Sequence, residues 1–201
     1  MRRTQGGVIV ERRLISMVVS NQPGVLSRVA GLFTRRGYNI DSLTVSATLD
    51  PAVSRITVVV TADEMILEQI VKQVEKLIDV MVVQVLDTAP VSRREVALVK
   101  VRNEDNQGLM DTVNAAHASV LDMGQSTITV EYVGDLDEVD RFLAALMPFG
   151  IVEMARTGLV ALSRGDGALV ETPSAACGGT SLKREAGSTL HKLIENPLSP
   201  S

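Results

Sequence analysis

Residues 14–37, LISMVVSNQPGVLSRVAGLFTRRG, combine a strand, a turn and a helix in one stretch of chain. The apolar run 14–19 is typical of a buried strand, and the Asn-Gln-Pro-Gly sequence after it consists of residues that favour turns. Arg35, Arg36 and Gly37 indicate a helix end, because cations interact well with the C-terminal end of the helix dipole and glycine can adopt the left-handed conformation. Between turn and end, apolar residues recur at helical spacing: Val25, Leu26, Val29, Leu32 and Phe33.

The sequence after this unit adds two strands, a second helix and a last strand. Strands are predicted at 38–49 and 53–61, where they pair as a hairpin. Thr61 and Glu64 have the spacing of a capping box and predict the start of the second helix. The last strand is expected over residues 80–86. The order β-α-β-β-α-β is that of the ferredoxin-like fold, in which one antiparallel sheet carries two helices on one face.

The same order of elements recurs in the second half of the chain. We therefore assign the fold class as α+β, with two tandem ferredoxin-like βαββαβ modules. The elements expected in the second half are a strand at 96–101, a helix at 107–118, strands at 120–123 and 127–133, a helix at 136–147 that begins after Asp135, and a strand at 151–162.

Four segments follow from this division. The first module is assigned to residues 12–89 and the second module to residues 92–165, with Ala89-Pro90-Val91 as the link. Residues 1–11 lack a pattern and are expected to form a flexible leader. Residues 166–201 are rich in Gly, Ser, Pro and Ala and are expected to form a disordered tail.

Composition excludes several classes of function. With 24 acidic and 20 basic residues and only 2% aromatics, the chain lacks the basic stripes and stacking rings of a nucleic-acid binder. One cysteine cannot form a disulfide framework and is typical of a reducing compartment. The apolar run 8–10 ends at Glu11 and is too short for a signal peptide or a spanning helix. We expect a cytoplasmic protein that binds neither nucleic acid nor membrane.

Residues that could carry catalysis are sparse. His117 and His191 have no Cys, His or carboxylate at the spacing of metal ligands, so no metal site is expected. Cys177 lies in the tail, where no base could be held against it. The acidic residues after Asp135 are placed to interact with the helix dipole rather than to bind a metal. We therefore assign no catalytic residue.

The turn at 21–24 is the one candidate for ligand binding. Backbone N–H groups at a helix N-terminus favour a carboxylate, and Gly24 lets a ligand approach the backbone closely. Asn21 adds a side-chain amide that can both donate and accept. An ordinary turn between strand and helix explains the same residues, and local chemistry alone leaves both interpretations open.

Several segments closely resemble the small regulatory subunit of acetolactate synthase (acetohydroxyacid synthase). The resemblance covers about residues 12–166. Between residues 103 and 149 the order of the expected elements matches better than the amino-acid identities do. The segments that carry it are NQPGVLSRV (21–29), GLF (31–33), RGYNIDSLTV (36–45), SRIT (54–57), LEQI (67–70), LVKV (98–101), ARTG (155–158) and ALSRG (161–165).

The resemblance implies that the first module is an ACT domain, which senses an amino acid and pairs edge to edge as a homodimer. In this family valine binds at that interface. Leucine or isoleucine could bind too, because such pockets distinguish a methylene by only about 1–3 kcal/mol. Carried over to this chain, the polar end of valine would be held by Asn21, Gly24, Val25 and Leu26. The facing subunit would contribute Asn39 and Ile40.

The function implied by the resemblance is regulation of a separate large subunit. That catalytic subunit would carry thiamine diphosphate, Mg and FAD, and this chain would bind none of them. The chain would raise its activity and confer feedback inhibition by valine in the biosynthesis of valine, leucine and isoleucine. Two alternatives remain: a tandem ACT sensor that regulates another enzyme or transcription, and a stand-alone enzyme built on the same fold.

Overall fold

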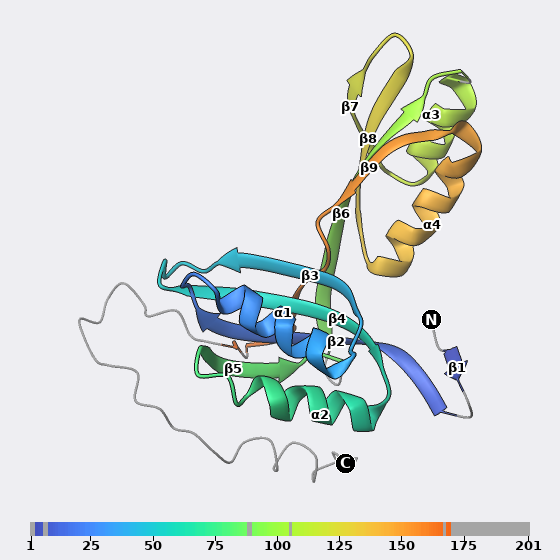
Figure 1. Ribbon diagram of the computed structural model, residues 1–201. Coiled ribbons are helices and arrows are strands. Elements are labelled where there is room, and N and C mark those ends of the chain that lie inside the picture. The colour runs from blue at the N-terminus through green and yellow to red at the C-terminus, as the bar shows by residue number, and fades with distance from the viewer. Residues whose placement is uncertain (1–2, 6–7, 88–89, 105, 167, 170–201) are drawn as a thin grey trace, which may run out of the picture. The chain divides into compact units, whose positions relative to one another are not determined.

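The computed structural model describes residues 3–5, 8–87, 90–104, 106–166 and 168–169 of the 201-residue chain (Figure 1). They form two five-stranded sheets, one in each predicted module. The first sheet contains β1 (Arg3–Gln5), β2 (Val8–Ser20), β3 (Ile40–Ala47), β4 (Val53–Ala62) and β5 (Val80–Val85), with helices α1 (Val25–Arg36) and α2 (Glu64–Val74). The second contains β6 (Val91–Arg102), β7 (Ser119–Met123), β8 (Thr127–Gly134), β9 (Ile151–Arg156) and β10 (Val160–Ser163), with α3 (Asn106–Ala115), α4 (Leu136–Leu146) and the 3-10 turn η1 (Met147–Phe149).

The first sheet has the antiparallel order β5-β2-β4-β3, with β1 paired to the start of β2. Helices α1 and α2 cover one face of this sheet (Figure 1). Alternate residues of β2, namely Ile15, Met17 and Val19, point into the core beneath the helices together with Phe33 of α1. This is the predicted ferredoxin-like arrangement.

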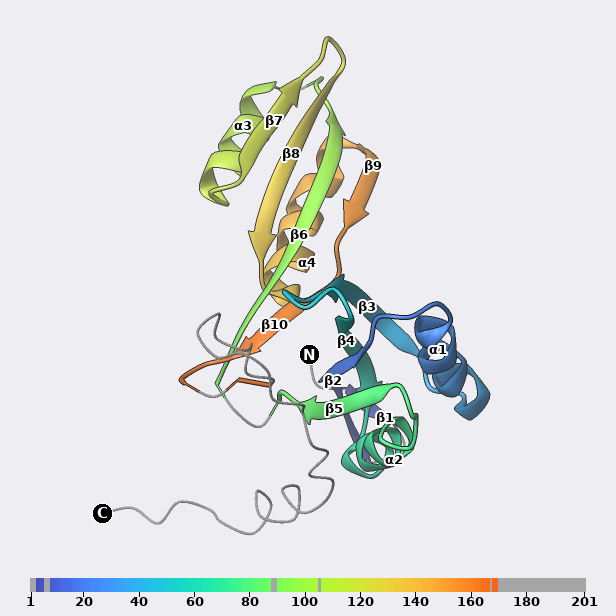
Figure 2. The same cartoon turned by 90° about the vertical axis from the view of Figure 1, so that its left-hand side faces the viewer.

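The second sheet repeats the order, as β9-β6-β8-β7, and also pairs β10 with β6 (Figure 2). Its core contains Val99 of β6, Val130 of β8 and Phe142 of α4. The predicted fold class of two tandem ferredoxin-like modules is therefore confirmed. Among the described residues, no helix is both long and apolar enough to span a membrane.

Helix α1 begins and ends where the sequence predicts. Gly24 is its N-cap with φ 86°, and Gly37 is its C-cap with φ 70°, both in the left-handed region that glycine adopts without steric cost. The Gly37 N–H donates to the carbonyl oxygens of Phe33 and Thr34. Val25, Val29, Leu32 and Phe33 are buried, so the predicted apolar stripe faces the sheet.

The described residues before position 12, which were assigned to the leader, lie in strands. Residues 3–5 form β1, and β2 begins at Val8, ahead of the predicted module boundary. The charged residues Glu11, Arg12 and Arg13 do not end β2, which continues to Ser20. Within this strand, Arg13 pairs with Glu64 of α2 at 2.8 Å. The predicted tail lies almost wholly outside the described residues, because residues 170–201 are not among them.

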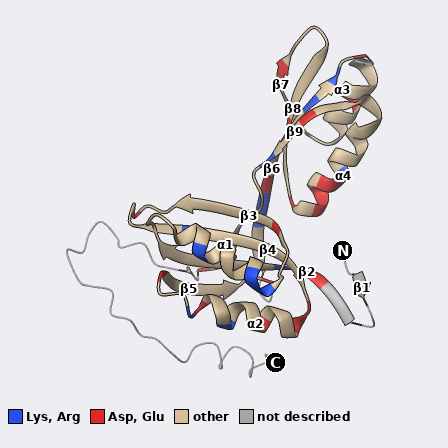
Figure 3. Ribbon diagram, viewed as in Figure 1, with Lys and Arg blue, Asp and Glu red and all other residues tan. Residues whose placement is uncertain are grey.

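The two predicted helix starts differ in outcome. The capping box of Thr61 and Glu64 is wrong: Asp63 is the N-cap of α2 and accepts a bond from the Ile66 N–H at 2.7 Å. Thr61 lies within β4. The start of α4 after Asp135 is confirmed, with a complete capping box to Glu138. Figure 3 shows the acidic residues gathered at this end of α4.

The strand predicted over 151–162 is two strands. β9 pairs with residues 97–101 of β6, whereas β10 pairs with residues 91–94 of the same strand. The chain turns between them at Gly158, which has φ 79°. A Cβ at Gly158 would lie 2.6 Å from Ser42 Oγ and 2.7 Å from Thr44 Oγ1, so this turn is fitted closely against β3.

Candidate functional site

The predicted ligand loop joins β2 to α1, and Asn21 fixes its position. The Asn21 N–H donates to the Ala52 carbonyl at 2.7 Å, and its side-chain Nδ2 donates to the Pro51 carbonyl at 2.8 Å. Both bonds hold the loop against the turn before β4. The side-chain amide that the sequence analysis offered to a ligand therefore already has a protein acceptor.

The N-terminus of α1 is open to a carboxylate. No side-chain hydrogen bond caps this helix, and the N-cap position is held by Gly24. The first N–H groups of a helix have no partner within the helix, so they attract an anion when no side chain satisfies them. Val25 is buried in the core, and its N–H donates to the Gln22 carbonyl at 3.3 Å, whereas the Leu26 side chain is 42% exposed beside the loop.

Asn39 and Ile40 lie at the other end of α1, at the start of β3. Asn39 Nδ2 donates to Asp41 Oδ1 at 2.9 Å, and the half-buried Ile40 packs against the first core. Helix α1 has 12 residues, so the two groups are about 18 Å apart along its axis. One chain therefore does not bring all six predicted residues together. In the predicted pocket, Asn39 and Ile40 come from a second copy of the chain.

An ion pair between Arg28 of α1 and Asp79 also holds the loop 21–24 in place. Arg28 Nε donates to Asp79 Oδ2 at 2.7 Å, and the Ser20 N–H donates to the Asp79 carbonyl at 2.9 Å. The hydrogen bond from Arg28 lowers the pKa of the Asp79 carboxyl below its usual value. The sequence analysis missed this pair, because its two residues are 51 positions apart and no local pattern links them.

This ion pair makes part of the stability depend on pH. Because the folded state lowers the pKa of Asp79, its stabilising contribution is present above the unfolded-state pKa and is lost as pH falls through the folded-state pKa. We expect Asp79→Asn to be less stable than the wild type near neutral pH, with the difference shrinking below about pH 4. Urea unfolding of both proteins across this range measures the difference, and a difference that stays constant with pH contradicts the assignment.

Metal ligands do not gather in the described part of the chain. No group of three or more His, Cys, Asp or Glu residues there could hold a metal ion. His117 follows the end of α3 in the left-handed region, at φ 56°. His191 and Cys177 lie outside the described residues.

Comparison with protein families defines the class of protein. Residues 15–82 match the family described as "AHAS small subunit-like ACT domain", and residues 94–165 match "Small subunit of acetolactate synthase". The chain is thus a tandem ferredoxin-like protein with an ACT domain as its first module.

Individual relatives agree along nearly their whole length. A probable acetolactate synthase small subunit from Methanothermobacter thermautotrophicus is 42% identical over 77% of this chain and 94% of its own. The isozyme 3 small subunit from Salmonella typhimurium is 43% identical over 77% of this chain and 97% of its own. The crystal structure of the Thermotoga maritima small subunit is similar with a TM-score of 0.72, at 38% identity, covering 78% of this chain and 99% of that one. The chain belongs to the acetolactate synthase small-subunit family.

Proposed function

We propose that this chain activates the catalytic large subunit of acetolactate synthase and makes it sensitive to inhibition by valine. Membership of the small-subunit family implies a large subunit as partner. The observation that carries the effector assignment is the uncapped N-terminus of α1 at Gly24. Its N–H groups suit the carboxylate of an amino acid, and the exposed Leu26 offers an apolar contact.

The effector site is completed by a homodimer in this proposal. β3 pairs with β4 along one side, and its other side is an edge of the sheet. An exposed sheet edge invites pairing with another chain, and two identical edges meet about a two-fold axis. Such pairing brings Asn39 and Ile40 of one copy toward the loop 21–26 of the other. Leucine and isoleucine fit the same chemistry, because such a pocket distinguishes a methylene by only about 1–3 kcal/mol.

The cofactors of the reaction belong to the large subunit in this proposal. Thiamine diphosphate, Mg and FAD are expected there, and this chain supplies none of the catalytic groups. Its role is to shift the large subunit between more and less active arrangements in branched-chain amino acid biosynthesis. Coupling between two such sites is typically about 1–3 kcal/mol.

The test is acetolactate formation by the large subunit from the same organism. Activity is measured with and without this chain, and each mixture with and without valine. We expect activation by the chain and inhibition by valine only in its presence. Activation without inhibition contradicts the assignment of valine as the effector. If the chain has no effect on activity, the proposed partnership with the large subunit is contradicted, and a tandem ACT sensor of another enzyme or of transcription is favoured.

Valine should also stabilise the isolated chain. A ligand at a hundred times its dissociation constant raises the free energy of unfolding by about 2.7 kcal/mol when it binds the folded state alone. We therefore expect the melting temperature to rise with valine and to be unchanged by D-valine at the same concentration. An unmoved melting temperature at saturating L-valine contradicts a site formed by this chain alone.

A further inference from the structure

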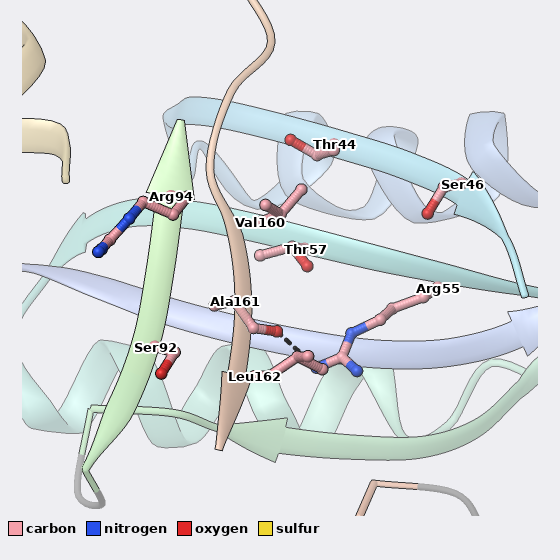
Figure 4. Close-up of a pocket in the computed structure, with 9 residues that line it drawn as sticks. All are labelled: Thr44, Ser46, Arg55, Thr57, Ser92, Arg94, Val160, Ala161 and Leu162. Carbon is pink, nitrogen blue, oxygen red and sulfur yellow. Dashed lines mark hydrogen bonds between the residues drawn. The ribbon is translucent and has the colours of Figure 1, made fainter. Parts of the chain in front are cut away.

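A second pocket lies on the face of the first sheet that the helices leave open. It has a volume of about 310 Å³ and is bounded by β3 and β4 on one side and by β6 and β10 on the other (Figure 4). The residues that line it are Thr44, Ser46, Arg55, Thr57, Ser92, Arg94, Val160, Ala161 and Leu162. This set contains two arginines and four hydroxyl groups and no carboxylate.

Arg55 is held in place by neutral partners. Its Nε donates to Ser16 Oγ at 2.9 Å, and its Nη2 donates to the Ala161 carbonyl at 2.9 Å. A guanidinium has five N–H donors, so these two bonds orient the group and leave further donors for a ligand. Within the described part of the chain, Arg55 has no carboxylate partner. Burial lowers the pKa of Arg55, because the charged form of a side chain is less stable away from water.

A second guanidinium group lines the same pocket, and a third contacts one of its lining residues. Arg94 lines it and donates to the neighbouring Arg93 carbonyl at 2.8 Å. Arg164 Nε donates at 3.3 Å to Ser92 Oγ, which is itself part of the lining. Neither side chain pairs with an acid among the described residues.

The positive charge here contrasts with the rest of the molecule. The chain has a formal net charge of -4, and other arginines of the second module are paired, such as Arg93 with Asp135 and Arg156 with Glu95. Pairing is the rule for a buried or half-buried cation, because an unpaired charge is costly away from water. The half-buried Arg55 departs from that rule, and the exposed Arg94 adds a second positive charge at the same pocket.

The Ser46 and Thr57 hydroxyl groups add donors to this pocket, whereas Thr44 Oγ1 already donates to the Thr157 carbonyl at 3.3 Å. Thr57 is almost fully buried, and its side chain faces the pocket in Figure 4 beside Thr44 and Ser46. Val160 and Leu162 form an apolar wall on the opposite side, and both are exposed. Fixed guanidinium and hydroxyl donors beside apolar side chains are typical of a site for a small organic anion.

We propose that this pocket binds a small oxyanion, the carboxylate or phosphate group of a metabolite, at a site separate from the loop 21–26. Guanidinium groups bind both kinds of anion through paired N–H donors. The volume lies at the lower end of small-molecule sites and has room for a small organic acid or a phosphate ester. Because Arg55 belongs to the first module and Arg94 to the second, the bound anion contacts both modules.

The test is calorimetric titration of the full chain with inorganic phosphate and, separately, with succinate, at constant ionic strength. We expect at least one of the two anions to bind with one site per chain, and which one binds tells a phosphate ligand from a carboxylate ligand. Arg94→Gln should weaken that binding by at least about tenfold, since a hydrogen bond to a charged group is lost. Arg94 is exposed, so this variant should keep its fold.

A matched control separates the site from general charge effects. Arg141→Gln removes the same charge from an exposed position on α4, and it should leave binding unchanged. Gly24→Asp should also leave it unchanged, which makes the result independent of the valine proposal. Absence of binding by both anions overturns the proposal, and so does equal weakening in Arg94→Gln and Arg141→Gln. Arg55→Lys keeps the charge but loses the fork of donors, and unchanged affinity in that variant equally overturns it.

Discussion

Replacing Arg156 with methionine is expected to lower the free energy of unfolding by about 3–5 kcal/mol, the usual cost of leaving a buried charge without its partner. Glu95 of β6 is 3% exposed, and Arg156 of β9 binds both of its oxygens. The bonds are 2.6 Å from Nη2 to Oε2 and 3.0 Å from Nε to Oε1. This geometry is the bidentate pair in which guanidinium and carboxylate interact most strongly.

The loss is large because Arg156 is the one cation bonded to Glu95 among the residues that the structure describes. Arg156 Nη1 also donates to Asp140 of α4 at 2.9 Å, so one side chain ties β6, β9 and α4 together. The hydrogen bonds that Arg156 donates to Glu95 raise the pKa of Arg156, so the guanidinium keeps its charge. Removing both charges should cost less than removing one.

Urea unfolding at neutral pH measures these changes. A matched control is Lys100→Met, which breaks the exposed pair of Lys100 with Glu153 across the same two strands, at 3.6 Å. That variant should lose no more than about 1 kcal/mol. The double variant Glu95→Leu/Arg156→Met should be more stable than Arg156→Met alone. If Arg156→Met loses no more stability than Lys100→Met, the pair has no special role.

The parts of the fold that the sequence predicted depend on local patterns. The alternation of Ile15, Met17 and Val19 is visible without the structure, and so is the helical spacing of the apolar residues of α1. The end of α1 at Gly37 follows from backbone geometry alone. Each of these patterns is complete within a short stretch of consecutive residues.

The parts that it did not predict depend on contacts between distant segments. The break after β9 lies at Gly158 because the chain there approaches Ser42 and Thr44 closely, more than a hundred positions earlier. Thr61 matches a capping box, yet its hydroxyl donates to Asp41 of β3 at 2.6 Å and is not at the helix start. A local pattern cannot show which of two available partners a side chain takes.

The candidate sites divide in the same way. The loop at Gly24 was visible in the sequence, because a Pro-Gly turn before a helix is a local feature. The direction of the Asn21 amide toward Pro51 was not visible, since it depends on a turn about thirty residues away. The pocket of Arg55 and Arg94 also escaped the sequence analysis, because its residues come from both modules and share no spacing.

Replacing Gly24 with aspartate is expected to abolish inhibition by valine while leaving activation of the large subunit largely intact. The aspartate carboxylate would lie at the N-terminus of α1, where the carboxylate of valine is proposed to bind. Two carboxylates at one site repel each other. A Cβ at Gly24 meets Arg28 Nη1 at 3.1 Å, so the end of this side chain must shift slightly while its Nε stays bonded to Asp79. Aspartate tolerates the left-handed conformation at φ 86° better than most residues, so the helix should still form.

The matched control for this change is Gly24→Asn, which has the same size and the same tolerance of the left-handed region but carries no charge. Both variants are assayed with the large subunit for acetolactate formation across a range of valine concentrations. Charge repulsion predicts complete loss of inhibition in Gly24→Asp and a weaker response in Gly24→Asn. Equal loss in both variants would assign the effect to bulk at the N-cap instead of charge. Inhibition that is unchanged in Gly24→Asp would place the effector elsewhere, since no ligand carboxylate could share the N-terminus of α1 with an aspartate.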